Sequence, residues 1–324
     1  MVAGRQPAAG LNSEKMMTIM VTGGAGFIGS HVVDRLMDMG HNVVVIDDLS
    51  QGSLTNIARH LDDRARFKFY EGDVKDLDAI VDAIGEGWRV KAIVHLAAMS
   101  RIQPSINDPI GAFHQNAVGT INVLEIARRI GVKRVVYAAS SSAYGLANEP
   151  PLVETMPVDC LNPYSLSKHV GEELMTLYER LYSLSTVSLR FFNVYGPRHK
   201  DDGAYATVIA IFLRQLVEGR PFTIVGDGEQ RRDFTHVADV RDAVLLALFN
   251  REVTGVVNIG TGQNFSINEI AAMIDPTHPV EHIAKRLGEA RTTLALNARA
   301  LVDLGWQPSV SIEDGLKELK ERRS

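Results

Sequence analysis

Residues 18–29, with the sequence TIMVTGGAGFIG, decide the fold of this chain. The run from Thr18 to Thr22 is typical of a buried strand, and Phe27 begins a segment with helical spacing of apolar residues that extends to Met39. Glycines at 23, 26 and 29 allow a tight turn, a close approach of the backbone to a diphosphate, and close packing of the helix. The stretch therefore predicts a strand-turn-helix unit whose helix N-terminus faces the phosphates of a dinucleotide.

The rest of the first half repeats this alternation of strand and helix. Strands are predicted at residues 42–46, 66–70, 91–95, 133–137 and 186–190, and helices at about 76–84, 107–130 and 162–182. The strands are near-continuous apolar runs rich in Val and Ile, which is typical of a parallel sheet covered by helices on both faces. The predicted fold class is therefore α/β, a doubly wound parallel sheet of the Rossmann type.

The second half predicts a smaller mixed α/β C-terminal lobe. Loops follow Asn193, and then a helix at 205–218, a strand at 222–225, a helix at 236–249 and a strand at 256–259 are expected. Ser266, with Glu269 three residues on, predicts the capped start of another helix. The expected domains are a disordered leader at 1–17, a nucleotide-binding domain at 18–193 with 234–260 packing back on it, and a substrate-binding lobe at 194–233 and 261–320.

Bulk properties narrow the class of protein. The chain has 324 residues, 45% hydrophobic and 23% charged, which suits one large globular domain or two joined ones. Its net charge of −5 argues against nucleic acid or an anionic membrane as the main partner. The single cysteine, Cys160, excludes an internal disulfide and a cysteine-based metal cluster, and no metal site is expected. Without an apolar run of membrane-spanning length or a signal-peptide core, a cytoplasmic setting is expected.

Acids and small residues at the ends of the next strands extend the dinucleotide site. Asp47, at the end of the second strand, can accept hydrogen bonds from a ribose, and Asp48 can share this role. A carboxylate there opposes the extra phosphate of NADP, so NAD is the predicted cofactor. Further contacts are expected after the third and fourth strands, although these residues could equally be a turn acid and sheet packing: Asp73, Val74, Leu96, Ala97 and Ala98.

A tyrosine and a lysine one helical turn apart supply candidate chemistry. Tyr164 and Lys168 lie on one face of the predicted helix, downstream of a strand that ends at Ser140. A phenol has a pKa of about 10, so work as a base at neutral pH needs a shift of roughly 3 units, or about 4 kcal/mol. Lys168 and a bound nicotinamide cation could supply this shift by favouring the phenolate. The alternative is an accidental spacing on a surface helix.

Seven segments between Thr18 and about Leu319 together resemble one family. They are VTGGAGFIGS (21–30), HLAA (95–98), SSSAYG (140–145), YSLSK (164–168), LRFFNVYGP (189–197), GDGEQRRDF (226–234) and LGW (304–306). The chain resembles the extended short-chain dehydrogenase/reductase family, and in particular its nucleotide-sugar 4-epimerases of the UDP-glucose 4-epimerase type. The resemblance implies an NAD enzyme that acts on a nucleotide sugar.

The resemblance also implies roles for individual residues. Ser140 matches the catalytic hydroxyl, Tyr164 the base, and Lys168 the lysine that binds the cofactor. Asn116 and Asn193 match asparagines of the cofactor and substrate pockets. The segment 203–209, including Ala206 and Val208, resembles the one that holds the nucleotide base. Arg232 and Arg286 match two arginines that clasp the diphosphate, for which guanidinium groups are well suited; their alternative role is surface solvation.

Ser141 and Ser142 bear on the reaction type. The family includes 4,6-dehydratases, which carry an Asp-Glu pair after the catalytic hydroxyl, and decarboxylases, which keep the Glu. Hydroxyl groups cannot replace carboxyl groups in proton transfer of that kind. The expected reaction is therefore epimerisation at carbon 4 of a UDP-hexose, such as UDP-glucose, UDP-galactose or their N-acetyl forms. A dehydratase, a reductase and a non-catalytic NAD-binding scaffold of the same fold are the alternatives.

Two further expectations concern shape. Residues 273–280 form a shorter stretch than the family pattern, and Gly288-Glu289-Ala290 replaces its usual Gly-Asp-Val, which affects the Arg286 assignment. Thr293 falls near a family position whose small size is compatible with a bulky sugar. The predicted helices at 107–130 and 162–182 could pair across a two-fold axis, so a homodimer is expected.

Overall fold

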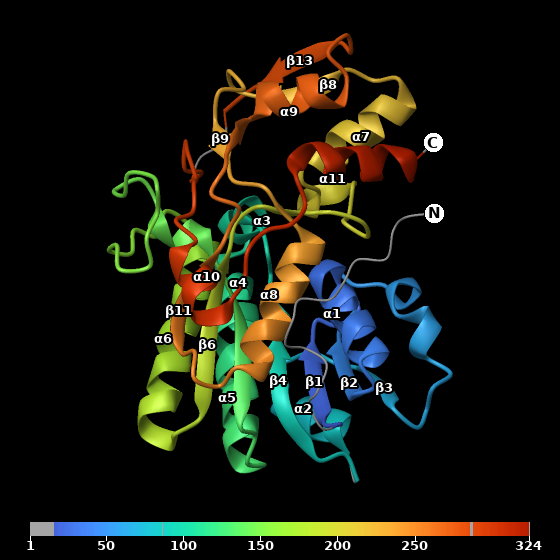
Figure 1. The fold of residues 1–324 in the computed structure, drawn as a ribbon, viewed down its shortest axis with the longest axis vertical. Coiled ribbons are helices and arrows are strands. Elements are labelled where there is room, and N and C mark those ends of the chain that lie inside the picture. Colours follow the sequence, from blue (N-terminus) through green and yellow to red (C-terminus); the bar gives the residue numbers. More distant parts are fainter. Residues whose placement is uncertain (1–15, 86, 286–287, 324) are drawn as a thin grey trace.

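A seven-stranded parallel sheet forms the larger part of the molecule (Figure 1). The computed structural model describes residues 16–85, 87–285 and 288–323. The strands are, in spatial order, β11 (Gly255–Ile259), β6 (Ser185–Phe191), β5 (Arg134–Ser140), β4 (Val90–His95), β1 (Thr18–Thr22), β2 (Asn42–Asp47) and β3 (Phe67–Glu71). The order reverses between β1 and β4, and in such sheets ligands bind beside the carboxyl ends of the strands at this switch point. The predicted α/β class is confirmed.

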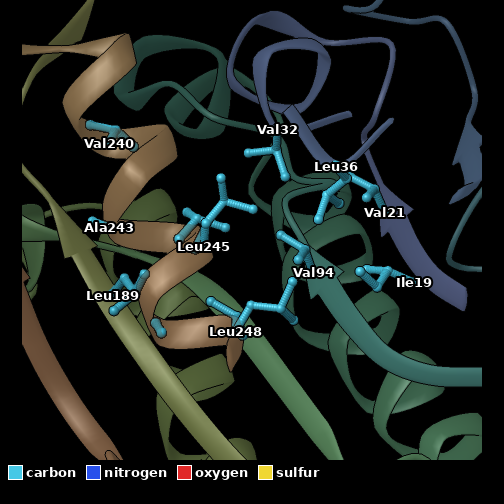
Figure 2. Packing of buried hydrophobic residues seen from close by; sticks show 14 of the residues in the cluster. Ile19, Val21, Val32, Leu36, Val94, Leu189, Val240, Ala243, Leu245 and Leu248 are labelled. Carbon is cyan, nitrogen blue, oxygen red and sulfur yellow. The ribbon is translucent and has the colours of Figure 1, made fainter. Parts of the chain in front are cut away.

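Helices cover both faces of this sheet. One face is covered by α1 (Phe27–Asp38), α8 (Val237–Phe249) and α10 (Ala298–Leu304), and the other by α2 (Leu77–Ile84), α5 (Gly119–Arg129) and α6 (Pro163–Tyr182). Figure 2 shows Val32 and Leu36 of α1 and Leu245 and Leu248 of α8 directed toward strand residues such as Val94. Every residue of β1 and β5 is buried, as the continuous apolar runs predicted.

The helix α8 is held against the sheet by a buried arginine. Arg134 on β5 donates from Nε and Nη2 to the carbonyl of Ala247 (2.9 and 2.7 Å), and Nη2 also donates to the Val253 carbonyl (2.8 Å). A cation at a helix C-terminus neutralises carbonyls that the helix leaves without partners. The segment 234–260 thus lies on the sheet, and β11 extends it.

Two boundaries differ from the expectation. Residues 298–306, which we had assigned to the lobe, pack on the sheet instead: α10 lies against β11 and α8, and Trp306 Nε1 donates to the Asp239 carbonyl (2.8 Å). The helix expected at 107–130 begins at Pro109 and runs through α4 (Pro109–Phe113), a π-helical turn (His114–Val118) and α5 without a gap, and a separate short helix, α3 (Ile102–Asn107), precedes it. The two helices separate at Asp108 because the residue before a proline avoids the helical region.

The remaining elements form a second lobe around its own apolar cluster (top of Figure 1). It contains α7 (Val208–Glu218), β8 (Phe222–Val225), α9 (Ile267–Ile274), β13 (Val280–Ile283) and α11 (Ile312–Glu321). The capping box at Ser266 is confirmed. Strand β13, which pairs in parallel with β8, was not predicted because all four of its residues are exposed and give no alternation of burial.

Short pairings and turns connect the two parts. The pairs are β7 (Val194–Tyr195) with β10 (Thr235–His236), and β9 (Arg231–Arg232) with β12 (Phe265–Ser266); 3₁₀ turns cover Leu54–Asn56, Ala58–His60, Ser141–Tyr144 and Gly203–Tyr205. Within the described part of the chain, no helix has the length and apolar character needed to cross a membrane.

Candidate active site

A cavity of about 710 Å³ lies between the carboxyl edge of the sheet and the lobe. The ends of β1, β2, β4 and β5 supply one wall, and segments 193–211, 223–234 and 288–293 supply the other. Of the predicted site residues that the structure describes, all but Asn116 line it, namely Gly23, Gly26, Phe27, Ile28, Gly29, Asp47, Asp48, Asp73, Val74, Leu96, Ala97, Ala98, Ser140, Ser141, Ser142, Tyr164, Lys168, Asn193, Ala206, Val208 and Arg232.

The glycine turn at one end of the cavity fits a dinucleotide diphosphate. Gly23 has φ +69°, and a Cβ there would lie 2.8 Å from the backbone nitrogen of Ala97. A Cβ on Gly29 would overlap the Gly23 carbonyl oxygen. Gly26 caps α1 without a side chain, the first turn carries no acid, and residues 26–29 line the cavity, as an anion site at a helix N-terminus requires.

Asp47 connects this turn to the second strand. Its two carboxylate oxygens accept N–H bonds from Ala25 and Leu49, each at 2.9 Å, and burial raises its pKa. Each oxygen keeps a further lone pair, which suits ribose hydroxyls. Asp48 instead accepts from the backbone and hydroxyl of Ser50. Asp73 lies farther along the same wall, where it pairs with Lys75 (3.1 Å).

Asn116 lies behind the cavity wall and not on it. Its side chain accepts from the Met99 N–H (2.8 Å) and donates to the Met99 carbonyl (3.1 Å) and to Ser167 Oγ (2.8 Å). With 1% exposure and all these groups engaged, it connects the segment after β4 to the helix that carries Tyr164. The geometry therefore does not support the cofactor contact we expected for Asn116, and favours a positioning role.

The end of β5 and the start of α6 bring the candidate catalytic groups together. Ser140 accepts from the backbone and hydroxyl of Ser142 (3.2 and 2.8 Å). Asn162 and Ser165 form a capping box at the start of α6, and Pro163 occupies its first turn. Burial raises the pKa of Tyr164, while a hydrogen bond with Ser140 and the positive charge of Arg101 act in the opposite direction.

Lys168 lies one turn along α6 in an apolar setting. Its Nζ sits 4.4 Å from the centroid of the Tyr137 ring, and burial lowers its pKa to about 7, against the influence of Glu172. The Arg190–Glu172 pair (2.8 Å) anchors this part of α6 to β6.

The lobe contributes a cationic patch opposite the strand ends. Arg232 donates to the carbonyls of Arg231 and Arg291 and lies 3.6 Å from a carboxylate oxygen of Glu289. Asn193 donates to the Asp233 carbonyl and to Thr293 Oγ1. Arg286 lies outside the described residues.

Two residues that line the cavity, Arg101 and His199, were not predicted from the sequence. Arg101 lies six residues beyond β4, and His199 lies in the loop after β7. A lone arginine just past a strand end was the available signal for Arg101. His199 had none, because its position depends on contacts between segments far apart in the chain.

The fold and the cavity define a dinucleotide-dependent enzyme of the Rossmann class. Residues 19–260 match the model of the NAD dependent epimerase/dehydratase family. The chain belongs to this family, and NAD is its cofactor.

Relatives of known name span nearly the whole chain. A UDP-glucose 4-epimerase of Mycolicibacterium smegmatis is 38% identical (94% of this chain, 98% of the relative). A UDP-glucuronate 4-epimerase of Thermodesulfobacterium geofontis is 33% identical (92% and 93%). UDP-glucuronic acid decarboxylase 4 of Arabidopsis thaliana is 32% identical (95% and 70%).

Solved structures give the same result. The UDP-glucose 4-epimerase of Thermotoga maritima with UDP-glucose superposes with a TM-score of 0.87 at 35% identity (94% of this chain, 98% of that chain). The UDP-glucose 4-epimerase of Thermus thermophilus with NAD also has a TM-score of 0.87, at 32% identity (95% and 99%).

Proposed function

We propose that the chain catalyses NAD-dependent epimerisation at carbon 4 of a UDP-hexose. The observation that carries the proposal is the meeting of Ser140, Tyr164 and Lys168 in one cavity with the glycine turn on one side and Arg232 on the other. This arrangement supports a cofactor and a diphosphate-bearing sugar side by side. The relatives named as UDP-sugar 4-epimerases support the same reaction.

The chain's own residues handle the proton. Tyr164, as phenolate, removes the proton from the hydroxyl on carbon 4, and Ser140 holds that hydroxyl by a hydrogen bond. The glycine turn and Asp47 would hold NAD, which would supply a hydride acceptor for carbon 4 and a hydride donor for the opposite face of the ketone. Tyr164 then gives its proton back to the oxygen, so the reaction has no net consumption of cofactor or acid. Lys168 holds a proton at Nζ beside this pair and orients the bound dinucleotide.

The distribution of carboxylates argues for epimerisation over elimination. Among the described residues that line the cavity, the carboxylates are Asp47, Asp48, Asp73 and Glu289. Three lie at or just after the ends of β2 and β3, on the cofactor side, and Glu289 lies beside Arg232. Ser141 and Ser142, which follow Ser140, carry hydroxyls only. Removal of water from carbons 5 and 6 needs an acid and a base near the sugar, and no described carboxylate of the cavity lining follows β5.

The substrate class rests on the lobe. Arg232, whose pKa burial lowers, is a cation that a diphosphate can engage by displacing Glu289. Glucose, galactose and their N-acetyl forms are the proposed sugars, with uracil as the base by analogy with the relatives. Thr293, next to Asn193, leaves the wall small at that point.

We also propose that the protein works as a homodimer in the cytoplasm. Ile121 on α5, and Leu166, Leu177 and Leu181 on α6, are exposed by 39–62%, and those on α6 recur at spacings of eleven and four residues, which places them on one face. This face points away from the sheet, so a second copy could cover it in a four-helix arrangement. A half-buried free Cys160 suits a reducing compartment. A solution mass equal to one chain would contradict the dimer.

The experiment is incubation of the NAD-loaded protein with UDP-glucose, UDP-galactose or their N-acetyl forms. Equilibration of at least one sugar with its 4-epimer, without net NADH, is expected. Accumulation of a 4-keto-6-deoxy sugar would instead indicate a dehydratase. Stoichiometric NADH release would indicate a dehydrogenase.

A further inference from the structure

Two hydrogen bonds from Ser142 converge on the hydroxyl oxygen of Ser140. The backbone N–H of Ser142 donates to Ser140 Oγ (3.2 Å), and the Ser142 hydroxyl donates to the same oxygen (2.8 Å). A serine hydroxyl has one proton to donate and two lone pairs that can accept. Both lone pairs of Ser140 are therefore occupied, and the only hydrogen bond left to its hydroxyl is one that it donates.

Helix capping accounts for only one of these two bonds. Ser140 is the N-cap of the 3₁₀ turn Ser141–Tyr144, and the bond from the Ser142 N–H is the capping bond. The Ser142 hydroxyl takes no part in the cap. Ser142 is half-buried and lines the cavity, so its hydroxyl could equally face the ligand space. Its bond to Ser140 Oγ instead determines what the Ser140 hydroxyl can do.

The turn that carries Ser142 is held by the sheet and by a neighbouring loop. The Tyr144 hydroxyl donates to Asn258 Oδ1 on β11 (2.7 Å). The backbone N–H of Asp159 donates to the Ala143 carbonyl (2.8 Å), and the carboxylate of Asp159 accepts two backbone N–H bonds just after the turn (2.8 and 2.9 Å). All these partners belong to the protein itself, so the position of Ser142 is set before a sugar binds.

The setting of Tyr164 agrees with a Ser140 hydroxyl that donates. Burial raises the pKa of Tyr164, and a hydrogen bond with Ser140 lowers it. A hydrogen bond lowers the pKa of an acid when it favours the charged form, and a phenolate oxygen can only accept. Ser140 is therefore the donor in this bond, as the two bonds from Ser142 require.

A hydroxyl that can only donate treats the sugar and its ketone differently from an ordinary hydroxyl. In the first half-reaction the proton on the carbon 4 oxygen goes to Tyr164 and the hydride goes to NAD, while Ser140 keeps its own proton. The sugar hydroxyl can donate and accept, but the carbonyl oxygen of the 4-ketose can only accept. An ordinary Ser140 would bind the hydroxyl in two ways and the carbonyl in one. With its lone pairs filled by Ser142, Ser140 loses the bond that would favour the starting sugar alone.

We propose that Ser142 is a positioning residue for Ser140: by filling both lone pairs of the Ser140 hydroxyl, it makes that hydroxyl a donor only and so favours the 4-keto sugar over the starting hydroxyl. The proposal rests on the proposed epimerisation, in which Ser140 contacts the carbon 4 oxygen. Ser142 acts through Ser140 and does not itself exchange a proton with the sugar.

The test compares Ser142→Ala and Ser142→Thr in the NAD-loaded enzyme, with the UDP-hexose that the wild type epimerises. Alanine frees one lone pair of Ser140, whereas threonine keeps the hydroxyl that fills it. In Ser142→Ala, kcat and kcat/KM should both fall about 5- to 10-fold, as expected when one hydrogen bond is lost from the transition state. Ser142→Thr should regain most of this loss. Ser311→Ala is the matched control and should change neither constant, because the Ser311 hydroxyl bonds Asp314 at the start of α11, away from the cavity.

A second readout follows the ketone and not the turnover. With the UDP-hexose at saturation, the NADH absorbance of the mixture measures the fraction of enzyme that holds the 4-ketose, and this fraction should be several-fold lower in Ser142→Ala than in the wild type. An unchanged fraction would overturn the proposal whatever kcat does, because a purely structural role would leave it unmoved. A Ser142→Thr variant that melts like the wild type but regains neither quantity would overturn it as well. If the wild type epimerises no UDP-hexose, the proposed function itself fails, and this proposal with it.

Discussion

The cofactor side and the substrate side of the cavity offer different chemical groups to their ligands. On the cofactor side the Gly23 turn and the N-terminus of α1 offer main-chain groups, and the Asp47 carboxylate is held in place by two backbone N–H groups. On the substrate side the corresponding groups come from long charged side chains, above all Arg232 on β9. The cofactor side depends on glycines, because a Cβ at Gly23 or Gly29 would collide with backbone atoms. The substrate side depends on charge and tolerates small changes of shape.

The comparison predicts where each kind of substitution will act. Changes on the cofactor side should affect folding and NAD binding together, because the same atoms do both. Changes on the substrate side should affect substrate affinity and leave the fold intact. Tyr164 lies where the sides meet and should affect chemistry alone.

Tyr164→Phe should have the largest effect. Loss of the proton acceptor should lower kcat by roughly 10²- to 10⁴-fold, while NAD stays bound and the melting temperature hardly moves. Turnover of UDP-sugar and the NAD content of the purified protein are the measurements. Tyr178→Phe is the matched control, because Tyr178 lies on the same helix, buried away from the cavity. Equal turnover in the two variants would refute the assignment of the base.

Lys168→Met should have the next largest effect, with a rise in the stability of the apo protein and a fall in activity. The pKa of Lys168 falls from 10.5 to about 7 on folding, so the unfolded chain binds more protons between these values and wild-type stability rises with pH across this window. Below pH 7 the cost of the buried ammonium is complete. The apo variant should therefore be more stable than wild type by a few kcal/mol at pH 6, with a smaller advantage toward pH 10, while activity falls. Denaturant unfolding at the two pH values measures this difference; a difference that does not depend on pH would contradict it.

Gly29→Ala should damage fold and cofactor binding together. The new Cβ would overlap the Gly23 carbonyl oxygen, which is backbone and cannot swing aside. Overpacking of this kind costs about 1–3 kcal/mol, and the displaced turn should also weaken NAD binding. Thermal unfolding and NAD titration are the measurements. In the control, Gly40→Ala, the Cβ meets no neighbour but Gly40 has φ +85°, so stability should fall without loss of NAD affinity. Unchanged NAD affinity in Gly29→Ala would break the link between fold and binding on this side.

The same contrast explains which parts of the fold could be predicted from the sequence. The strands of the sheet and the glycine turn were predictable because their signals are local: continuous apolar runs, and glycines at a fixed spacing. Strand β13 was missed because it is fully exposed and carries no periodic pattern.

The predictions of individual site residues also depend on whether the signal is local in the sequence. Asn116 was expected at the cofactor because its position matched a pattern, yet its side chain is used up by Met99 and Ser167. The setting of Arg101 could not be predicted, because it depends on His199 and Tyr205, about a hundred residues away in the chain. A residue's type and its neighbours in sequence do not contain such contacts.

Arg232→Gln should give the smallest and most selective effect. Glutamine keeps donors for the carbonyls of Arg231 and Arg291 but removes the charge that a diphosphate would engage. Hydrogen bonds to charged groups are worth about 1.5–3 kcal/mol, so KM for the UDP-sugar should rise about 10- to 100-fold with little change in melting temperature. The control is Arg291→Gln, because the Arg291 side chain is exposed and pairs with Asp227 at the surface.

The outcome for Arg232 bears directly on the contrast between the two sides. Arg232 already has a carboxylate beside it in Glu289, so the variant removes one partner of a pair and leaves Glu289 with a more solvated charge. If the substrate side depends on charge alone, Glu289→Gln should move KM in the opposite direction, since the diphosphate then has no anion to displace. A marked loss of stability in Arg232→Gln, or a rise of KM in both variants, would mean that this side also depends on a fixed network, as the cofactor side does.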